Sequence, residues 1–251
     1  MTLTADMFWI VCPLAALAGF IDSIAGGGGI ISLPAYYLAG LPPALAAGTN
    51  KLSAMMGAAT ATFNYMKAGK IVWRVGVPAV VGALICSTLG ALTLTALPQD
   101  AARILVLCCI PVAAVFTLRR PKLREHRMLS ETAKLWIAFG IGCVIGFYDG
   151  LIGPGAGAFY MIGFVTLAGY GVLRATAHTK LLNFASNLGG LIAFAAIGAP
   201  WWKLGLAMGL AQVAGARIGS KLAMRVGAKV IKPLLVTTST LLALRLIWQM
   251  L

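Results

Sequence analysis

The sequence predicts an all-α integral membrane protein with about eight hydrophobic spans in two homologous halves. The chain of 251 residues is 60% hydrophobic and 10% charged, with a mean hydropathy of +0.92, which lies outside the soluble range. Apolar runs long enough to cross a bilayer recur along the whole chain. A motif of one aspartate and several glycines at 19–29 returns at 146–157. We therefore expect repeats at 1–118 and 135–251, joined by a basic cytoplasmic linker at 119–134.

The first half begins with an apolar segment at 7–25 that runs into the consecutive glycines 26–29 and resumes as a short piece to residue 39. Glycine is a poor helix former, so we expect a broken helix or a hairpin here. A turn at 40–43 precedes the next span. Further spans are predicted over 44–65, 75–96 and 104–118.

The second half repeats this order. A span from residue 135 reaches a second glycine-rich break at 153–157, which contains Pro154, and a short piece continues to 168. Further spans are predicted around 175–181 and over 204–224 and 233–250. At offsets of 127 and 129, Asp22 matches Asp149 and Lys51 matches Lys180.

The distribution of Lys and Arg distinguishes two topologies, because these residues favour cytoplasmic loops. If each broken segment crosses fully, the halves are parallel and the basic loop at 221–232 lies outside. If each broken segment returns to the same side, the second half is inverted, and the basic loops at 67–74, 119–134 and 221–232 are all cytoplasmic. The charges favour the inverted repeat. The length of 7–25, which suffices to cross alone, keeps the first topology open.

Other classes of function are disfavoured. The net charge of +14 comes from cations in short loops, where membrane topology explains them, so we expect no nucleic-acid partner. The five cysteines lack metal-ligand spacing, and we expect neither a metal nor a cofactor. The chain also shows no convincing pair of nucleophile and base, which argues against an enzyme.

Two acids are placed unusually. Of the six acids in the chain, only Asp22 and Asp149 lie within apolar spans, where an ionisable group costs a few kcal/mol or more unless it is paired or hydrated. Each aspartate could cap the helix beyond its glycines. Each could also couple transport to protons or ions, and the two roles are compatible.

Lys51 and Lys180 form a second matched pair in polar surroundings. Each could simply extend toward the membrane interface. The hydroxyl and amide groups nearby favour another role, because together with a cation they supply donors for an oxyanion. The starts of the second helix pieces, near 28–30 and 155–157, would add backbone N–H groups. For His178, a hydrogen-bonded structural role is favoured over a proton relay.

These motifs together resemble those of a known family. Gly19-x-x-Asp22 with the following glycines, Pro34, Gly48-Thr-Asn-Lys-Leu52 and Gly69-Lys-Ile71 are similar to the sulfite exporter TauE/SafE family of membrane transporters. A weaker second copy extends the resemblance over essentially the whole chain. The resemblance implies secondary transport, often export, of a small sulfur-containing anion such as sulfite or an organosulfonate across the bacterial cytoplasmic (inner) membrane.

The residues and the resemblance together give a set of expected site residues. The expected substrate-binding residues are Gly26, Gly27, Gly28, Gly29, Thr49, Asn50, Lys51, Gly153, Gly155, Gly157, His178, Thr179, Lys180 and Asn183. Asp22 and Asp149 are the expected coupling residues. The second copy departs from the first at Pro154, Ala156 and His178, so the halves need not contact the substrate equally. The expected partners are the anion and the lipid bilayer, and a homo-oligomer is compatible with the sequence. An anion channel is the main alternative, and a membrane-embedded enzyme is less favoured.

Overall fold

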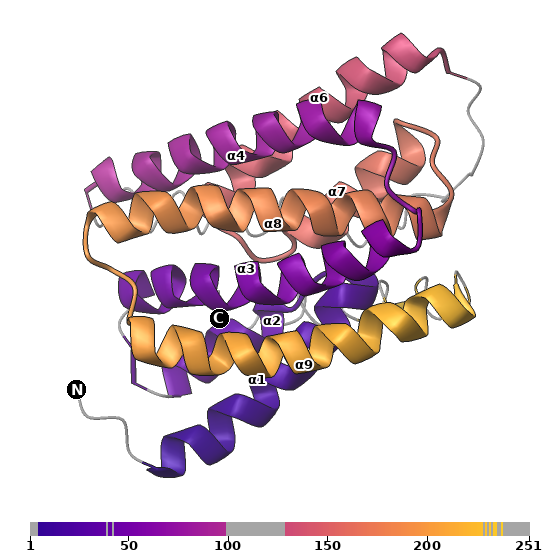
Figure 1. Ribbon diagram of the computed structural model, residues 1–251. Helices are drawn as coiled ribbons and strands as arrows, with labels where there is room; N and C mark the ends of the chain where they lie inside the picture. Colours follow the sequence, from indigo (N-terminus) through magenta and orange to yellow (C-terminus); the bar gives the residue numbers. More distant parts are fainter. Residues whose placement is uncertain are drawn as a thin grey trace.

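The computed structural model describes residues 5–38, 40–41, 43–98 and 129–227 and a few isolated positions beyond (Figure 1). Every regular element in these ranges is an α-helix, which confirms the all-helical prediction for this part of the chain. The first half contains α1 (Ala5–Ala25), α2 (Gly29–Leu38), α3 (Pro43–Lys67) and α4 (Trp73–Ala96). The second half contains α6 (Glu131–Leu151), α7 (Ala156–Thr166), α8 (Val172–Ala196) and α9 (Trp202–Val226).

The predicted spans at 104–118 and 233–250 lie outside the described residues, apart from isolated positions in the second. Among the described helices, Trp73–Ala96 and Glu131–Leu151 are long and apolar enough to cross a membrane. The outer face of α4 shows why, because Val77, Val81, Ile85 and Leu89 recur every four residues and are about half exposed. A continuous apolar stripe of this kind suits contact with lipid.

Close packing between the two halves depends on small residues. The largest contacts are those of α4 with α6 and of α1 with α9. A methyl group added at Gly142, Gly146 or Gly150 of α6 would collide with backbone atoms of α4. Small residues four apart let helix backbones approach closely within a membrane. Each half therefore packs its last described helix against the first helix of the other half.

The central helices α3 and α8 are antiparallel. Gly48, near the start of α3, lies against Phe194 near the end of α8, and Gly190 of α8 lies against Lys51 of α3. By contrast, α9 runs parallel to α3, because Gly205 contacts Thr49 while Ser220 bonds Asn64 further along. As a result, the α3–α4 and α8–α9 turns lie at opposite ends of the bundle (Figure 1).

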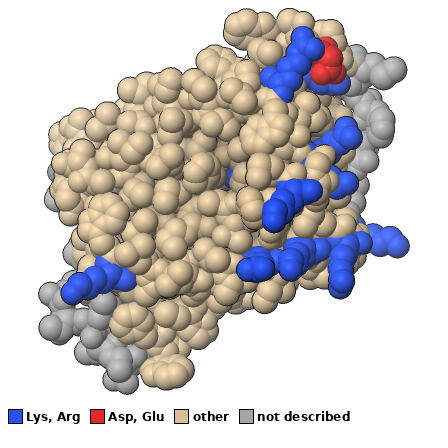
Figure 2. Space-filling model, in the orientation of Figure 1, with Lys and Arg blue, Asp and Glu red and all other residues tan. Residues whose placement is uncertain are grey.

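Most of the visible cations gather at one end of the molecule (Figure 2). The directions of the helices explain this, because the end of α3 and the starts of α4, α6 and α8 meet there together with the end of α9. These segments carry Lys67, Lys70, Arg74, Lys134, Arg174, Lys221 and Arg225. Lys203 lies at the start of α9, toward the other end. The described part of the chain is therefore strongly polarised in charge.

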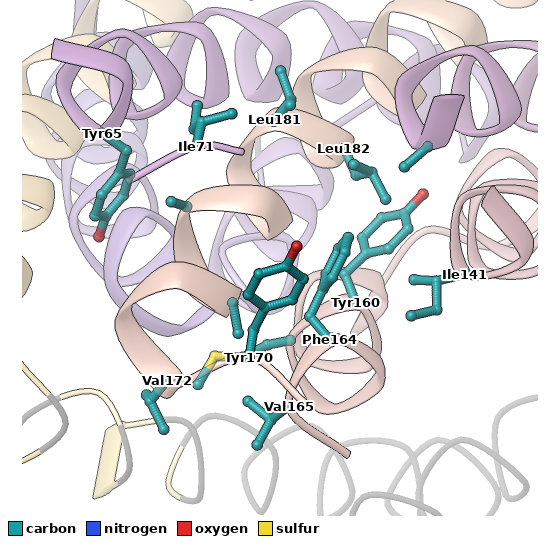
Figure 3. Packing of buried hydrophobic residues seen from close by; sticks show 14 of the residues in the cluster. Tyr65, Ile71, Ile141, Tyr160, Phe164, Val165, Tyr170, Val172, Leu181 and Leu182 are labelled. Atoms are coloured by element: carbon teal, nitrogen blue, oxygen red, sulfur yellow. The ribbon is translucent and has the colours of Figure 1, made fainter. Parts of the chain in front are cut away.

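The short helix α7 lies in the interior of the bundle. Nearly all of its residues are buried, and Tyr160, Phe164 and Val165 pack with Tyr170 and Leu182 in the largest apolar cluster (Figure 3). This packing fixes the position of the chain segment that precedes α7. That segment forms one wall of an interior cavity.

Candidate functional site

The two glycine-rich segments between helices meet in the interior. Gly26 and Gly27, between α1 and α2, have φ values of +81° and +95°, and Gly153 and Gly155, between α6 and α7, have +89° and +87°. Glycine adopts these values without the steric cost that other residues incur. A Cβ atom added to Gly26 would lie 2.7 Å from the carbonyl carbon of Gly157. The glycine segment that follows α1 is thus in direct contact with the first turn of α7, 131 positions further along the chain.

A buried ion pair joins α3 to the end of α6. The Nζ atom of Lys51 lies 2.9 Å from Oδ1 of Asp149 and donates a second hydrogen bond, of 2.7 Å, to the backbone oxygen of the same residue. The hydroxyl of Ser186 donates to Oδ2. The side chains of Lys51 and Asp149 are only 6% and 7% exposed. Lys51 therefore does not extend toward the membrane interface.

A second ion pair joins α8 to α1. The Nζ atom of Lys180 lies 3.0 Å from Oδ2 of Asp22, and the backbone N–H of Gly28 donates to Oδ1 over 3.2 Å. The Lys180 side chain is fully buried, whereas that of Asp22 is 23% exposed. Each lysine thus pairs with the aspartate of the opposite half. Removing one partner of a buried pair typically costs about 3–5 kcal/mol, so both pairs help to hold the halves together.

A cavity of about 70 Å³ lies where the two connections and both ion pairs converge. A water molecule needs about 10–15 Å³ by this measure, so the cavity could hold roughly five waters or one small oxyanion. Most of the predicted site residues line it. They are Asp22, Gly27, Gly28, Gly29, Asn50, Lys51, Asp149, Gly153, Gly155, Gly157 and Asn183.

Amide side chains add hydrogen-bond donors to the wall. Oδ1 of Asn50 accepts a hydrogen bond of 2.6 Å from the hydroxyl of Ser32, so the NH₂ group of Asn50 points elsewhere. On the other side of the cavity, Nδ2 of Asn183 is the neighbour that a Cβ atom at Gly157 would meet at 3.0 Å. Amide N–H groups beside a lysine and two helix N-termini can bind an anion.

Five predicted residues lie outside the cavity wall within the described part of the chain: Gly26, Thr49, His178, Thr179 and Lys180. Gly26 packs on Gly157, and Lys180 reaches the site through Asp22. Thr49 accepts a hydrogen bond from the backbone N–H of Trp201 and so joins α3 to the start of α9. That these five residues take part in transport is still a prediction.

His178 has the hydrogen-bonded surroundings that the sequence favoured. Its Nε2 accepts from the backbone N–H of Val72 over 3.2 Å, and its Nδ1 lies 2.8 Å from the carbonyl of Arg174. This pattern fits a neutral ring that donates through Nδ1. The ring also stacks on Tyr170 at 4.9 Å between centroids. Thr179 is fully buried, and its hydroxyl has no hydrogen-bond partner among the described residues.

Three polar residues of the cavity wall were absent from the predicted set: Ser32, Asn187 and Gln212. Gln212 is an uncharged amide on the buried face of α9, and it donates to Ser53 over 3.1 Å. The sequence signal for Gln212 was a polar side chain inside an apolar helix. This signal was weak because the matching position in α4 is Ala83, so the two halves show no matched polar pair there.

The chemistry of the wall suits binding better than reaction. Lysine, amide and backbone N–H groups face carboxylates that are already paired, and no group of three His, Cys, Asp or Glu side chains able to hold a metal occurs in the described ranges. That the protein needs no metal remains an expectation from the sequence, because part of the chain lies outside the described ranges.

Comparison with known proteins identifies the family. The sequence profile described as "Sulfite exporter TauE/SafE" matches residues 11–246 and so includes both connections and both ion pairs. The chain belongs to this family. The resemblance inferred from the motifs is thereby confirmed.

Relatives within the TauE/SafE family carry the names of transporters. The chain is 47% identical over 234 residues to a probable membrane transporter protein, ORF9, of a Sinorhizobium species, a match that covers 93% of this chain and 89% of the relative. It is 39% identical over 254 residues to the probable membrane transporter protein YfcA of Escherichia coli, covering 98% and 94%. A probable membrane transporter protein of Haemophilus influenzae is 32% identical, covering 99% and 98%. No solved structure matches the chain significantly.

As a TauE/SafE protein, the chain is a member of a membrane transporter family.

Proposed function

We propose that this protein is a secondary transporter, working as an exporter, of a small sulfur-containing anion such as sulfite or an organosulfonate across the bacterial cytoplasmic membrane. One observation carries the proposal: a cavity of about 70 Å³, lined by Lys51 and by glycine and amide donors, lies between two meeting chain breaks inside an apolar bundle. Its size suits a small oxyanion.

The proposed arrangement in the membrane is a multi-pass inverted repeat with about eight hydrophobic spans, in which each half begins with a glycine-broken helix. The antiparallel packing of α3 and α8 supports inversion, because equivalent helices then run in opposite directions. The positive φ values at Gly26 and Gly153 support breaks at those positions. The clustering of Lys and Arg at one end supports a cytoplasmic location for that end (Figure 2).

The anion would bind between the starts of α2 and α7. There it would accept hydrogen bonds from the amide groups of Asn50 and Asn183 and from backbone N–H groups of the glycine segments. Lys51 would supply positive charge from the cavity wall, while Lys180 would act from behind Asp22. An array of donors without a nucleophile and a base beside it favours binding over a reaction.

Alternating access would require the two halves to move relative to each other. Both ion pairs cross between the halves, so each such movement must lengthen or exchange them. A change in protonation of Asp22 or Asp149 would change the charge of the site at the same time. This places proton coupling at the two aspartates in our proposal.

The test is anion flux in proteoliposomes. We expect sulfite uptake or release to respond to a proton gradient, and to fall at least tenfold in Lys51→Met and in Asn183→Ala. Lys221→Met, on the exposed surface of α9, is the matched control and should transport normally. Asn183 belongs to neither ion pair, so its variant separates binding from loss of folding.

Two results would contradict the proposal. Flux that is equal in wild type, Lys51→Met and Asn183→Ala would remove the cavity as the binding site. Flux that follows the electrochemical gradient of the anion and ignores the proton gradient would indicate an anion channel instead.

A further inference from the structure

The charges around the cavity sum to zero before any anion binds. Lys51 and Lys180 supply two positive charges, and Asp149 and Asp22 supply two negative charges. Both carboxylates line the cavity, whereas only one of the lysines does. An anion that entered would therefore lie beside two negative groups in a buried site, where like charges repel strongly. One proton added to a carboxylate would restore neutrality.

The two carboxylates differ in their hydrogen-bond partners and in their exposure. Asp149 accepts from the Lys51 ammonium at 2.9 Å and from Ser186, and its side chain is 7% exposed. Asp22 accepts from Lys180 at 3.0 Å and from a backbone N–H at 3.2 Å, and its side chain is 23% exposed. A proton arriving through the cavity thus has better access to Asp22.

Asp22 also accepts a hydrogen bond from a backbone N–H group that a bound anion would otherwise use. The N–H group bonded to its Oδ1 belongs to Gly28, the residue just before α2, where the helix dipole favours negative charge. Asp22 in turn lies between the cavity and the buried Lys180. Its carboxylate therefore takes up both the N–H group and the lysine charge that would stabilise a bound anion. A neutral carboxyl would no longer balance the lysine charge and would accept from the N–H group more weakly.

We propose that Asp22 takes up one proton when the anion binds, so that anion and proton occupy the site together. This inference rests on the proposed function, because it assigns the coupling within the same cavity. The step is O⁻ of Asp22 plus H⁺ giving a neutral carboxyl, with no other bond made or broken. A singly charged anion and this proton would then cross the membrane together without net charge, so export would be driven by the outward concentration gradient of the anion.

The other charged and titratable groups around Asp22 are few. From α8 it faces Lys180, and from α3 the Tyr65 side chain lies close, with its hydroxyl bonded to the backbone oxygen of Ser23. Across the cavity it faces Lys51 and Asp149. The charged residues of α9, against which α1 packs, are exposed among the described positions, and α9 presents the neutral Gln212 to the cavity.

The test measures protons bound per anion on the full chain in lipid nanodiscs. Methanesulfonate is the probe, because it stays singly charged near neutral pH and cannot itself supply or take the proton. Calorimetric titrations in two buffers of different ionisation enthalpy, neither containing a sulfonate, give the proton number directly. We expect uptake of about one proton per anion, and an affinity that falls about tenfold per pH unit where uptake is complete.

Two variants assign the proton to one aspartate. Asp22→Asn should bind methanesulfonate without proton uptake and with no pH dependence. Asp149→Asn, the repeat-equivalent control, should keep the uptake. The wild-type proton number requires no variant, so a variant that fails to fold does not remove the test.

Three results would overturn the inference. One is methanesulfonate binding to the wild type with no proton taken up or with a proton released. Another is uptake that is lost in Asp149→Asn and kept in Asp22→Asn. In both of these cases the anion still binds, so the proposed function survives. Absence of binding by methanesulfonate and by sulfite would remove the proposed function and this inference together.

Discussion

The two ion pairs arise from equivalent positions of a repeat, yet they have different surroundings. Lys51–Asp149 is buried on both sides, and Ser186 completes it. Lys180–Asp22 has a fully buried lysine and an aspartate that borders the cavity. The difference lies in the neighbours, because Ser186 of α8 corresponds to Gly57 of α3 at an offset of 129. Charges at matched sequence positions can thus form one pair that is buried on both sides and one whose aspartate is partly exposed at the cavity.

The largest expected effect comes from breaking the buried pair. Lys51→Met should lower the free energy of unfolding by about 3–5 kcal/mol, because it leaves Asp149 without its cation in the interior. Lys180→Met should cost less, because water in the cavity can hydrate Asp22. Thermal unfolding in detergent checks the order, with Lys221→Met as the neutral control. Equal losses in the two variants would show that the pairs do not differ as argued.

Removing both partners of the buried pair sharpens the same comparison. Lys51→Met combined with Asp149→Leu should recover most of the lost stability, because a buried pair replaced by apolar groups is often neutral or better. Transport should not recover, since the cavity loses its lysine. Stability that stays as low as in Lys51→Met alone would mean that Lys51 stabilises the fold by its packing and not by its pairing.

The contact between the two connections provides the next effect. Gly26→Ala should cost about 1–2 kcal/mol for its left-handed backbone and a further 1–3 kcal/mol for the collision with Gly157. Gly69→Ala is the matched control, because it has a φ of +64° and open space around it, so only the backbone term remains. Thermal unfolding and flux measured on both variants separate the two terms. A Gly69→Ala variant as damaged as Gly26→Ala would argue against the contact.

The sequence singled out the four charged residues of the two ion pairs for a physical reason. A lysine or aspartate inside an apolar run is costly enough to stand out, and the repeat made Asp22 and Asp149, or Lys51 and Lys180, recognisable as equivalents. It did not predict which lysine pairs with which aspartate. Lys51 of α3 and Asp149 of α6 are 98 residues apart, and the packing of both helices against α8 brings them together.

The cavity wall was predictable only where a motif marked it. The glycines and Asn50 were identified because they belong to recognisable motifs, and Asn183 because it follows one closely. Ser32 and Gln212 have no polar counterpart in the other half, where Phe159 and Ala83 stand. Their side chains reach the cavity through the packing of α2 and α9 on α3. Such contacts depend on tertiary geometry that a repeat comparison cannot supply.

Removing the amide of Asn183, a donor that only the second half has, should give a smaller effect. Asn183→Ala should weaken anion binding by about 1.5–3 kcal/mol, the usual value of a hydrogen bond to a charged group. Its repeat equivalent is Ala54, which also borders the cavity. Titration calorimetry gives the affinity, and unchanged binding would show that the amide of Asn183 does not contact the anion. Asn187→Ala, on the same wall, indicates how specific the loss is.

The smallest effect should come from Ser32→Ala in the first half. The hydroxyl of Ser32 holds Oδ1 of Asn50 at 2.6 Å and so sets which face of the amide meets the cavity. Losing one neutral hydrogen bond costs about 0.5–1.5 kcal/mol, so anion affinity should fall by a factor of about 2 to 12 while the amide remains present. Asn50→Ala should lose more, because it removes the donor itself. If Ser32→Ala weakened binding as much as Asn50→Ala, the Ser32 hydroxyl would have to contact the anion directly, and the first half would contribute two donors where we assign one.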